Sequence, residues 1–235
     1  MTLLQNLQSQ FGQINDRIRQ VEQSCNRQGQ VQLLAVSKTK PASMVRKAWH
    51  LGQRHFGENY LQDALEKIET LSDLKDISWH FIGPIQSNKT RDIARHFQWV
   101  HSVDRLKIAR RLNDLRPDEL SPLNICLQVN ISNETSKSGI TVDELPGLVS
   151  SIDQLPRLKL RGLMAIPAPE SNPEKQRIPF RALREQLNYL NQSLQLDMDT
   201  LSMGMTNDLE AAILEGSTMV RIGTALFGAR DYSAK

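Results

Sequence analysis

The residue in this chain that most invites a chemical interpretation is Lys38, within the stretch LLAVSKTKP at residues 33–41. The apolar run before it, residues 31–37, has the aliphatic and β-branched composition of a buried strand. A lysine delivered to such a strand end becomes a nucleophile once it is partly desolvated, because burial disfavours the ammonium and frees the amine. Taken alone, a lysine at this place is more often a solvated charge.

Two stretches near the C-terminus contain residue types that bind phosphate. They are Gly204 with Thr206, and Gly223 with Thr224. Glycine lets backbone N–H groups approach an anion, a hydroxyl adds a donor, and a helix start adds a favourable dipole. The structural alternative is that Thr206 or Asn207 caps a helix, with Glu210 completing a capping box.

These residues can act together only if the fold gathers the ends of distant strands. A helical apolar period runs from Leu3 towards Gly29, and strands and helices then alternate. The expected strands are 31–37, 54–59, 77–83, 98–103, 123–130, 158–166, 199–204 and 218–223. The expected helices between them are 41–51, 60–71, 89–96, 105–115 with Asp104 as its cap, 142–152, 180–194 and 206–216.

Strict alternation predicts parallel strands joined by crossover helices. About eight such units predict a single α/β domain over residues 1–235, a (β/α)8 TIM-type barrel, with residues 1–28 as an extra helix packed on it. A doubly wound open sheet is the competing arrangement. In such a barrel the active site lies at the C-terminal ends of the strands, with phosphate bound after the last two. Lys38 and both glycine–threonine pairs fall at these places.

A lysine facing a phosphate site suggests a Schiff base to a phosphorylated aldehyde. Pyridoxal 5′-phosphate (PLP) has both groups and also needs a partner for its ring nitrogen, commonly Asp or Arg. Arg221 precedes the last glycine–threonine pair and points inward if Ile222 points outward. Its structural alternative is a salt bridge at the mouth of the barrel.

Composition excludes several other classes of protein. The formal charge is +3, from 29 basic and 26 acidic residues that are interleaved, so a nucleic-acid footprint is not expected. Cys25 and Cys126 are far apart, without a CxxC motif, which fits a reducing compartment. We see neither a signal peptide nor a long apolar run, and expect a cytoplasmic protein with no membrane contact. The five histidines show no zinc-binding spacing, so no metal is expected, and no GxSxG motif supports a hydrolase. His80 either lines the barrel or is a satisfied core histidine.

Six motifs, in this order along the chain, carry a resemblance to a known family. They are LLAVSKTKP, FGENY, WHFIGPIQSNK, GLMAI, LSMGMTNDLEAAI and VRIGTALFG. Together they resemble the YggS/PROSC family of pyridoxal phosphate homeostasis proteins, over nearly the whole chain. The resemblance implies a barrel like the N-terminal domain of alanine racemase, which is PLP fold type III, with Lys38 in a Schiff base to PLP. The other implied cofactor-binding residues are Thr206, Gly223 and Thr224 at the phosphate, Arg221 at the ring nitrogen, Asn59 beside the ring, and Met164, Ser202 and Met203 lining the pocket. Thr206 stands where the family usually has serine, which keeps the hydroxyl.

The resemblance implies a role in vitamin B6 homeostasis, affecting amino-acid and keto-acid metabolism, and not evident catalytic turnover. An arginine cannot hand its proton to the ring nitrogen, so it leaves the cofactor a poorer electron sink than an acid would. The sequence also ends 12 residues after Gly223, which leaves no room for the C-terminal domain of the fold-type III enzymes. An amino-acid racemase or decarboxylase is therefore the first alternative, and a Schiff-base aldolase acting on a phosphorylated sugar is the second. We expect a monomer, with PLP-dependent apoenzymes as possible recipients.

Overall fold

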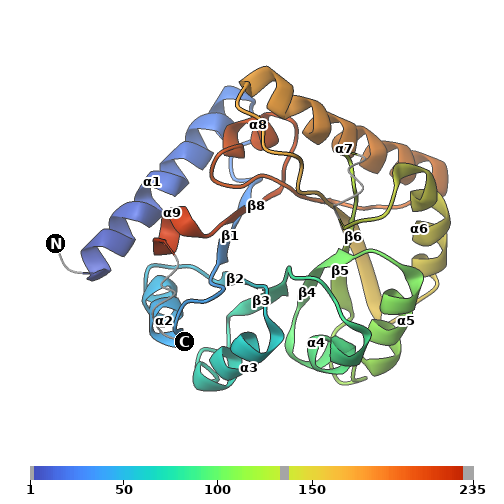
Figure 1. Cartoon of the computed structure of the whole chain (residues 1–235), viewed down its shortest axis with the longest axis horizontal. Coiled ribbons are helices and arrows are strands. Elements are labelled where there is room, and N and C mark those ends of the chain that lie inside the picture. The colour runs from blue at the N-terminus through green and yellow to red at the C-terminus, as the bar shows by residue number, and fades with distance from the viewer. Residues whose placement is uncertain (1–2, 133–137, 230–235) are drawn as a thin grey trace.

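The computed structural model describes residues 3–132 and 138–229, and there the strands form a closed parallel barrel in the order β1 to β8 (Figure 1). The strands are β1 (Gln32–Val36), β2 (His55–Glu58), β3 (Ser78–Phe81), β4 (Trp99–Val103), β5 (Leu123–Gln128), β6 (Leu158–Met164), β7 (Thr200–Ser202) and β8 (Met219–Ile222). The ring closes where β8 pairs with β1, from Gln32 opposite Met219 to Ala35 opposite Ile222. The predicted (β/α)8 barrel is confirmed, and the open sheet is wrong.

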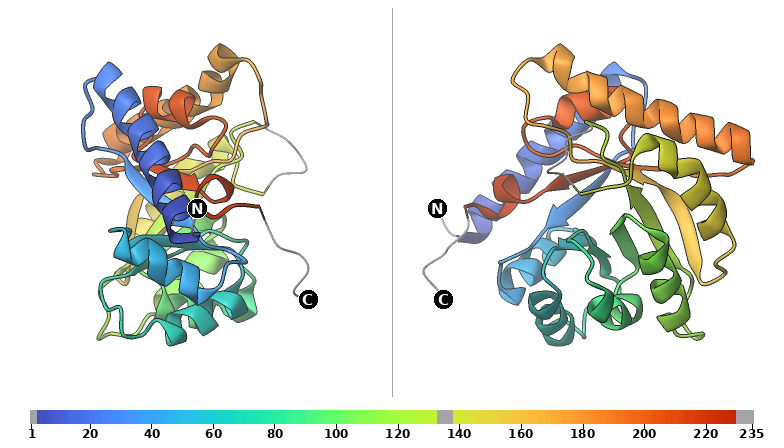
Figure 2. Two further views of the ribbon diagram at one scale, coloured as in Figure 1. Left: turned by 90° about the vertical axis from the view of Figure 1, so that its left-hand side faces the viewer. Right: turned by 45° about the vertical axis from the view of Figure 1, so that its right-hand side comes forward.

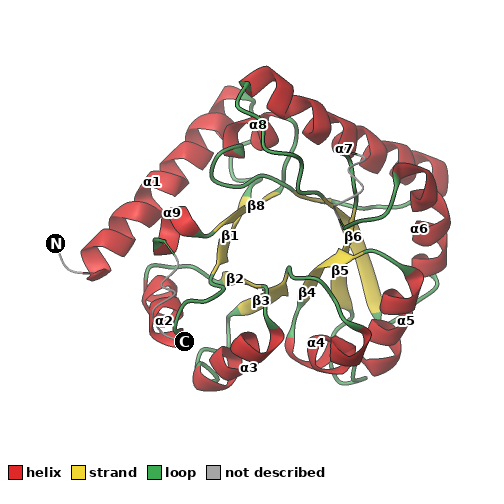
Figure 3. Ribbon diagram, viewed as in Figure 1, coloured by secondary structure: helices red, strands yellow, loops and turns green. Residues whose placement is uncertain are grey.

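Helices form an outer layer around the ring (Figure 3). They are α1 (Leu3–Ser24), α2 (Ala42–His50), α3 (Leu61–Thr70), α4 (Thr90–His96), α5 (Leu106–Leu115), α6 (Leu145–Asp153), α7 (Pro173–Leu194), α8 (Leu209–Leu214) and α9 (Thr224–Phe227), with short 3₁₀ turns at Ser87–Lys89 and Val142–Glu144. Each longer helix lays an apolar stripe on the barrel, as α5 does with Ile108 and Leu112, both fully buried. This burial is the main stabilisation of such helices. No helix within the described ranges is long and apolar enough to cross a membrane.

Helix α1 lies on the side of the barrel where the last helix is short (Figure 2). Phe11 packs edge-on against Phe227 of α9, with ring centroids 6.0 Å apart. Arg17 makes a two-pronged ion pair with Glu210 of α8, at 2.8 and 2.9 Å. Further along, Arg27 donates to the carbonyl oxygen of Ile213, at 2.8 Å. These contacts fix α1 to the helices that flank β8.

Three predicted boundaries are wrong. Helix α7 begins at Pro173 and not at residue 180, because Asn172 caps it by accepting from two backbone N–H groups and a proline is acceptable in the first turn. Helix α8 begins only at Leu209, with Asp208 as its N-cap, so the alternative of a cap by Thr206 with Glu210 fails. Asp104 does not cap α5 and instead pairs with Arg105.

The barrel interior contains polar side chains. His101 of β4 bonds Ser202 of β7, and because these strands are not neighbours in the ring, the contact crosses the interior. The residues just before them, Val100 and Leu201, belong instead to the apolar core. Strand alternation thus separates an apolar layer beneath the helices from a polar axis.

Candidate functional site

The predicted anchor and the predicted phosphate residues lie at neighbouring strand ends. Lys38 follows β1 in a turn and is half-buried, and Gly223 follows β8. A Cβ atom added to Gly223 would lie 3.3 Å from the carbonyl oxygen of Val36, two residues before Lys38. Glycine therefore permits β8 to run close beside the strand that carries the lysine.

Arg221 is a buried cation held by neutral groups. Its Nη1 donates to the backbone oxygen of Ser202 and, at 2.9 Å, to the Ser202 hydroxyl, while Nη2 donates to the carbonyl of Ala165 at 2.9 Å. Burial lowers the pKa of Arg221 to about 10, so the guanidinium stays protonated at neutral pH. No carboxylate contacts it in the described part of the chain, so the salt-bridge alternative finds no partner there. Such a cation suits an electron-rich partner, such as a pyridine nitrogen.

A chain of three histidines leads away from Arg221 through the interior. His101 Nδ1 lies 2.7 Å from the Ser202 hydroxyl, and its Nε2 lies 2.9 Å from His80 Nδ1. His80 Nε2 lies in turn 3.0 Å from Nδ1 of His55. Burial, with the charge of Arg221 adding to it, lowers the pKa of His101 to about 3, and burial lowers the pKa of His80 well below 6.5. Both rings are therefore neutral at pH 7, and His80 is both interior-facing and hydrogen-bonded.

A cavity of about 1130 Å³ lies at the mouth of the barrel. Thr206, Thr224 and Asp208 contribute to its wall, together with the 167–171 loop. Two predicted phosphate residues therefore border one space, and it is large enough for a ligand of cofactor size. The carboxylate of Asp208 accepts from the backbone N–H of Met205, and burial raises the pKa of Asp208.

The remaining predicted lining residues belong to two layers of the barrel, its interior and the apolar layer beneath the helices. Asn59 follows β2, and Gly83 approaches its carbonyl so closely that an added Cβ would lie 2.1 Å away. Met164 and Ser202 end adjacent strands, are paired in register and are buried. Met203 is also buried, but its side chain belongs to the apolar core, so the structure does not bring it into the interior beside Ser202.

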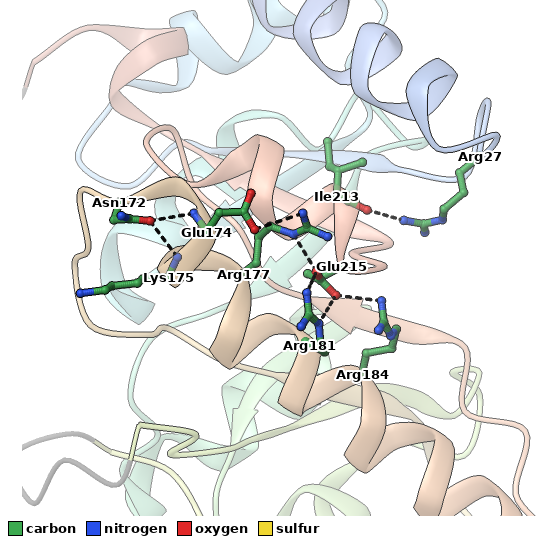
Figure 4. A network of polar contacts seen from close by, with 9 residues as sticks. All are labelled: Arg27, Asn172, Glu174, Lys175, Arg177, Arg181, Arg184, Ile213 and Glu215. Carbon is green, nitrogen blue, oxygen red and sulfur yellow. Dashed lines mark hydrogen bonds and ion pairs between the residues drawn. The ribbon is translucent and has the colours of Figure 1, made fainter.

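The carboxylate of Glu215, which directly follows α8, pairs with three arginines of α7 (Figure 4). Glu215 is 1% exposed and accepts from Arg177 at 2.7 Å, Arg181 at 2.9 Å and Arg184 at 3.0 Å. The three arginines occupy one face of α7. This cluster holds the helix that follows Thr206 and so supports the cavity wall.

Several polar residues near the site are absent from the sequence prediction. They are Glu58, Asp63 and Lys67 beside the Lys38 turn, and His55 and His101 in the interior. A signal existed for Glu58 and His101, since each is a polar residue in an otherwise buried strand. Lys67 gave none, because a lysine in an amphipathic helix is normally solvated. Among the residues described, no group of three or more His, Cys, Asp and Glu side chains is arranged to hold a metal.

Comparisons with known proteins agree on one family. The family model of the alanine racemase N-terminal domain matches residues 10–231. A pyridoxal phosphate homeostasis protein of Pseudomonas aeruginosa is 63% identical over 93% of this chain and 93% of its own length. The solved structure of PipY from Synechococcus elongatus with PLP bound is 38% identical, with a TM-score of 0.79 over 90% of this chain and all of that one. Alanine racemase from Corynebacterium glutamicum, 18% identical with a TM-score of 0.68, shares the fold over 99% of this chain and 63% of its own.

Proposed function

This chain belongs to the alanine racemase N-terminal domain family and, within it, to the pyridoxal phosphate homeostasis proteins, and we propose that it binds PLP covalently and serves PLP homeostasis. Lys38 is the proposed attachment point. Condensation of its amine with the aldehyde forms an imine and releases one water. A relative 38% identical binds PLP on the same fold, which supports the proposal.

The observation that carries this proposal is the environment of Arg221. Among the described residues, the hydrogen bonds of this buried guanidinium go to carbonyl and hydroxyl oxygens, which fits an uncharged ring nitrogen. Thr206 and Thr224 border one cavity, which suits a phosphate there. Lys38 does not line that cavity, but it follows β1, and Gly223 brings β8 against the end of that strand. In this arrangement Asn59, Met164 and Ser202 flank the ring, and Met203 contributes through its backbone.

PLP supplies an aldehyde for attachment and a ring that withdraws electrons when its nitrogen is protonated. This chain's own residues hold that ring without protonating it, because Arg221 keeps its proton at neutral pH. We therefore propose a protein that stores and delivers the cofactor, with little or no turnover. The alternative of a racemase or decarboxylase would need a proton donor at the ring nitrogen or further catalytic groups.

The test is uptake of PLP followed by borohydride reduction and peptide mass mapping. We expect a visible absorption band and a pyridoxyl group on Lys38. Lys38→Ala should lose both, whereas Lys40→Ala, whose lysine bonds the carbonyl of Ala229, should keep them. A colourless wild-type protein that fails to take up PLP would refute the proposal and favour the aldolase. Rapid racemisation or decarboxylation of single amino-acid enantiomers, lost in Lys38→Ala, would instead support the enzyme.

We further propose a monomer that works in the cytoplasm and delivers PLP to apoenzymes. Cys25 and Cys126 are both free thiols, and burial raises the pKa of Cys126 to about 12, which suits a reducing compartment. Light scattering tests the monomer. Transfer is tested by mixing holo-protein with a PLP-dependent apoenzyme and following the regain of that enzyme's activity, with a PLP scavenger present to exclude free cofactor.

A further inference from the structure

The turn that carries Lys38 is held from outside the barrel by side chains of β2 and α3. The ammonium of Lys67 donates to the carbonyl oxygen of Ser37 at 2.8 Å, just before Lys38. The carboxylate of Asp63 accepts from the N–H of Thr39, just after it, at 3.2 Å. Both peptide groups that flank Lys38 are therefore bonded to one face of a single helix.

The three charged groups behind this turn are bonded to one another. Lys67 Nζ lies 2.9 Å from Oε1 of Glu58 and 2.9 Å from Oδ2 of Asp63, one helical turn before it. Glu58 Oε1 also accepts from the Ser37 hydroxyl at 2.6 Å. The ammonium thus has one acceptor for each of its three protons, so Lys67 is not available as a nucleophile.

The cluster of Glu58, Lys67 and Asp63 is poorly suited to stabilising the fold. Glu58 is fully buried and Lys67 is 3% exposed, and Glu58 Oε2 has no hydrogen-bond partner among the residues that the structure describes. Burial raises the pKa of Glu58, against the opposing effect of Lys67. Apolar side chains of similar size commonly replace a buried ion pair at no cost in stability. A role in geometry explains better why charges are buried here.

The turn needs such support. Thr39 has a φ of +63°, in the left-handed region that residues with a Cβ rarely adopt. The hydrogen bond from its N–H to Asp63 holds the backbone in that conformation. Without this hydrogen bond the turn would relax, and the side chain of the preceding residue, Lys38, would point in a different direction.

We propose that Lys67, Asp63 and Glu58 are positioning residues that fix the backbone on both sides of Lys38 and so aim its amine at the cofactor. The inference rests on the proposed function, in which Lys38 is the attachment point for PLP. It concerns how fast and how selectively Lys38 reacts, and the three residues do not themselves contact the cofactor.

The test compares three variants with the wild type. Lys67→Met removes the ammonium and keeps the length of the side chain. Asp63→Asn weakens the acceptor for Thr39 and removes the charge that pairs with Lys67, at a carboxylate that is 36% exposed. Arg46→Met is the matched control, because it breaks an ion pair with Asp73 on the surface, away from the turn. Each variant is first shown to be folded by circular dichroism and its urea unfolding midpoint.

Two measurements are made on each folded variant. Amide hydrogen exchange of the ligand-free protein reports the Thr39 N–H, and stopped-flow absorbance with borohydride mapping reports reaction at Lys38. We expect both Lys67→Met and Asp63→Asn to exchange the Thr39 amide at least tenfold faster and to load PLP at least tenfold more slowly. Arg46→Met should match the wild type in both. If Lys67→Met does not fold, the inference is tested with Asp63→Asn alone.

Folded variants that load Lys38 at the wild-type rate would overturn the inference, whether or not the amide exchanges faster. A wild-type protein with no pyridoxyl group on Lys38 would refute the proposed function instead. In that case the exchange of the Thr39 amide still tests whether Lys67 and Asp63 hold the turn. Unchanged exchange in the variants would show that they do not, and faster exchange would show that they do.

Discussion

The histidine chain makes the barrel sensitive to mild acid. An unfolded histidine has a pKa of about 6.5, whereas the pKa of His101 in the folded barrel is about 3 and that of His80 is well below 6.5. As the pH falls, the unfolded chain therefore binds protons before the folded chain does. The stability from these neutral rings is fully present above about pH 6.5 and is lost as the pH falls towards the folded-state pKa.

The magnitude follows from that difference. At pH 5 nearly every unfolded histidine is protonated, while His101 in the folded protein is about 1% protonated. Integrating the linkage from pH 7 to pH 5 gives a loss of about 2 kcal/mol for His101. Burial also lowers the pKa of His80, so this ring adds to the loss in the same direction. The loss from His101 alone is an appreciable part of the 5–15 kcal/mol that stabilises an ordinary domain.

The assay is equilibrium urea denaturation of the ligand-free protein at pH 7, 6 and 5. Carboxylates with lowered pKa values, such as Asp199 paired with Arg161, titrate mostly below this window. Glu58 and Asp208, whose pKa values are raised by burial, oppose the histidine effect, so the comparison with a histidine variant is needed. His101→Asn should reduce the slope of unfolding free energy against pH by about 1 kcal/mol per unit. His96→Asn, which changes an exposed side chain, should leave the slope as it is.

Two results would refute this reasoning. One is a slope of unfolding free energy against pH, between pH 7 and pH 5, that is the same in His101→Asn as in the wild type. The other comes from NMR of the folded wild type, which needs no variant: imidazole resonances of His80 or His101 that titrate near pH 6.5 would show that burial does not hold these rings neutral.

Two further predictions concern the supports of the site, and both are measured by urea unfolding at pH 7. Glu215→Gln should cost about 2 kcal/mol, because hydrogen bonds to a charged group are worth 1.5–3 kcal/mol and three half-exposed arginines lose their shared carboxylate. Glu174→Gln, in which an 81% exposed side chain meets Arg177 at 3.6 Å, should cost less than about 0.5 kcal/mol, and equal losses would contradict the assignment. Gly83→Ala should destabilise the barrel by several kcal/mol and slow PLP uptake, because its Cβ would lie 2.1 Å from a backbone oxygen. Gly12→Ala, with open space on a helix, should instead stabilise by up to about 1 kcal/mol, and a neutral Gly83→Ala would show that the strand end can shift freely.

The features that the sequence predicted well are those with a local period. The alternation of strands and helices predicted the barrel. Within β8, the alternation of side chains predicted that Arg221 points inward because its neighbour Ile222 points outward. Boundaries were less certain where two local rules compete. The predicted helix over 180–194 begins after Pro179, but the cap at Asn172 starts α7 earlier and the helix accommodates the proline.

The features that could not be predicted are contacts between distant strands. His101 and Ser202 are 101 positions apart and meet only because the ring closes, so nothing near either residue signals the contact. The bond from Lys67 to the Ser37 carbonyl likewise spans 30 positions, and it forms only because the fold brings α3 beside the end of β1. Local pattern gives the face of an element, whereas the partner across a barrel follows from strand register and closure.

The interior polar axis and the proposed function share one physical basis. Arg221 and His101 contact the same hydroxyl, that of Ser202. A proton on His101 would place two cations around one buried oxygen, which is one reason that its pKa is about 3. At neutral pH, therefore, Arg221 keeps its proton, and His101 is neutral and does not act as an acid. If PLP binds with its ring nitrogen at Arg221, neither neighbour protonates it, and the ring stays a weak acceptor of electrons. The same hydrogen bonds that make the fold sensitive to acid would then favour holding the cofactor over using it.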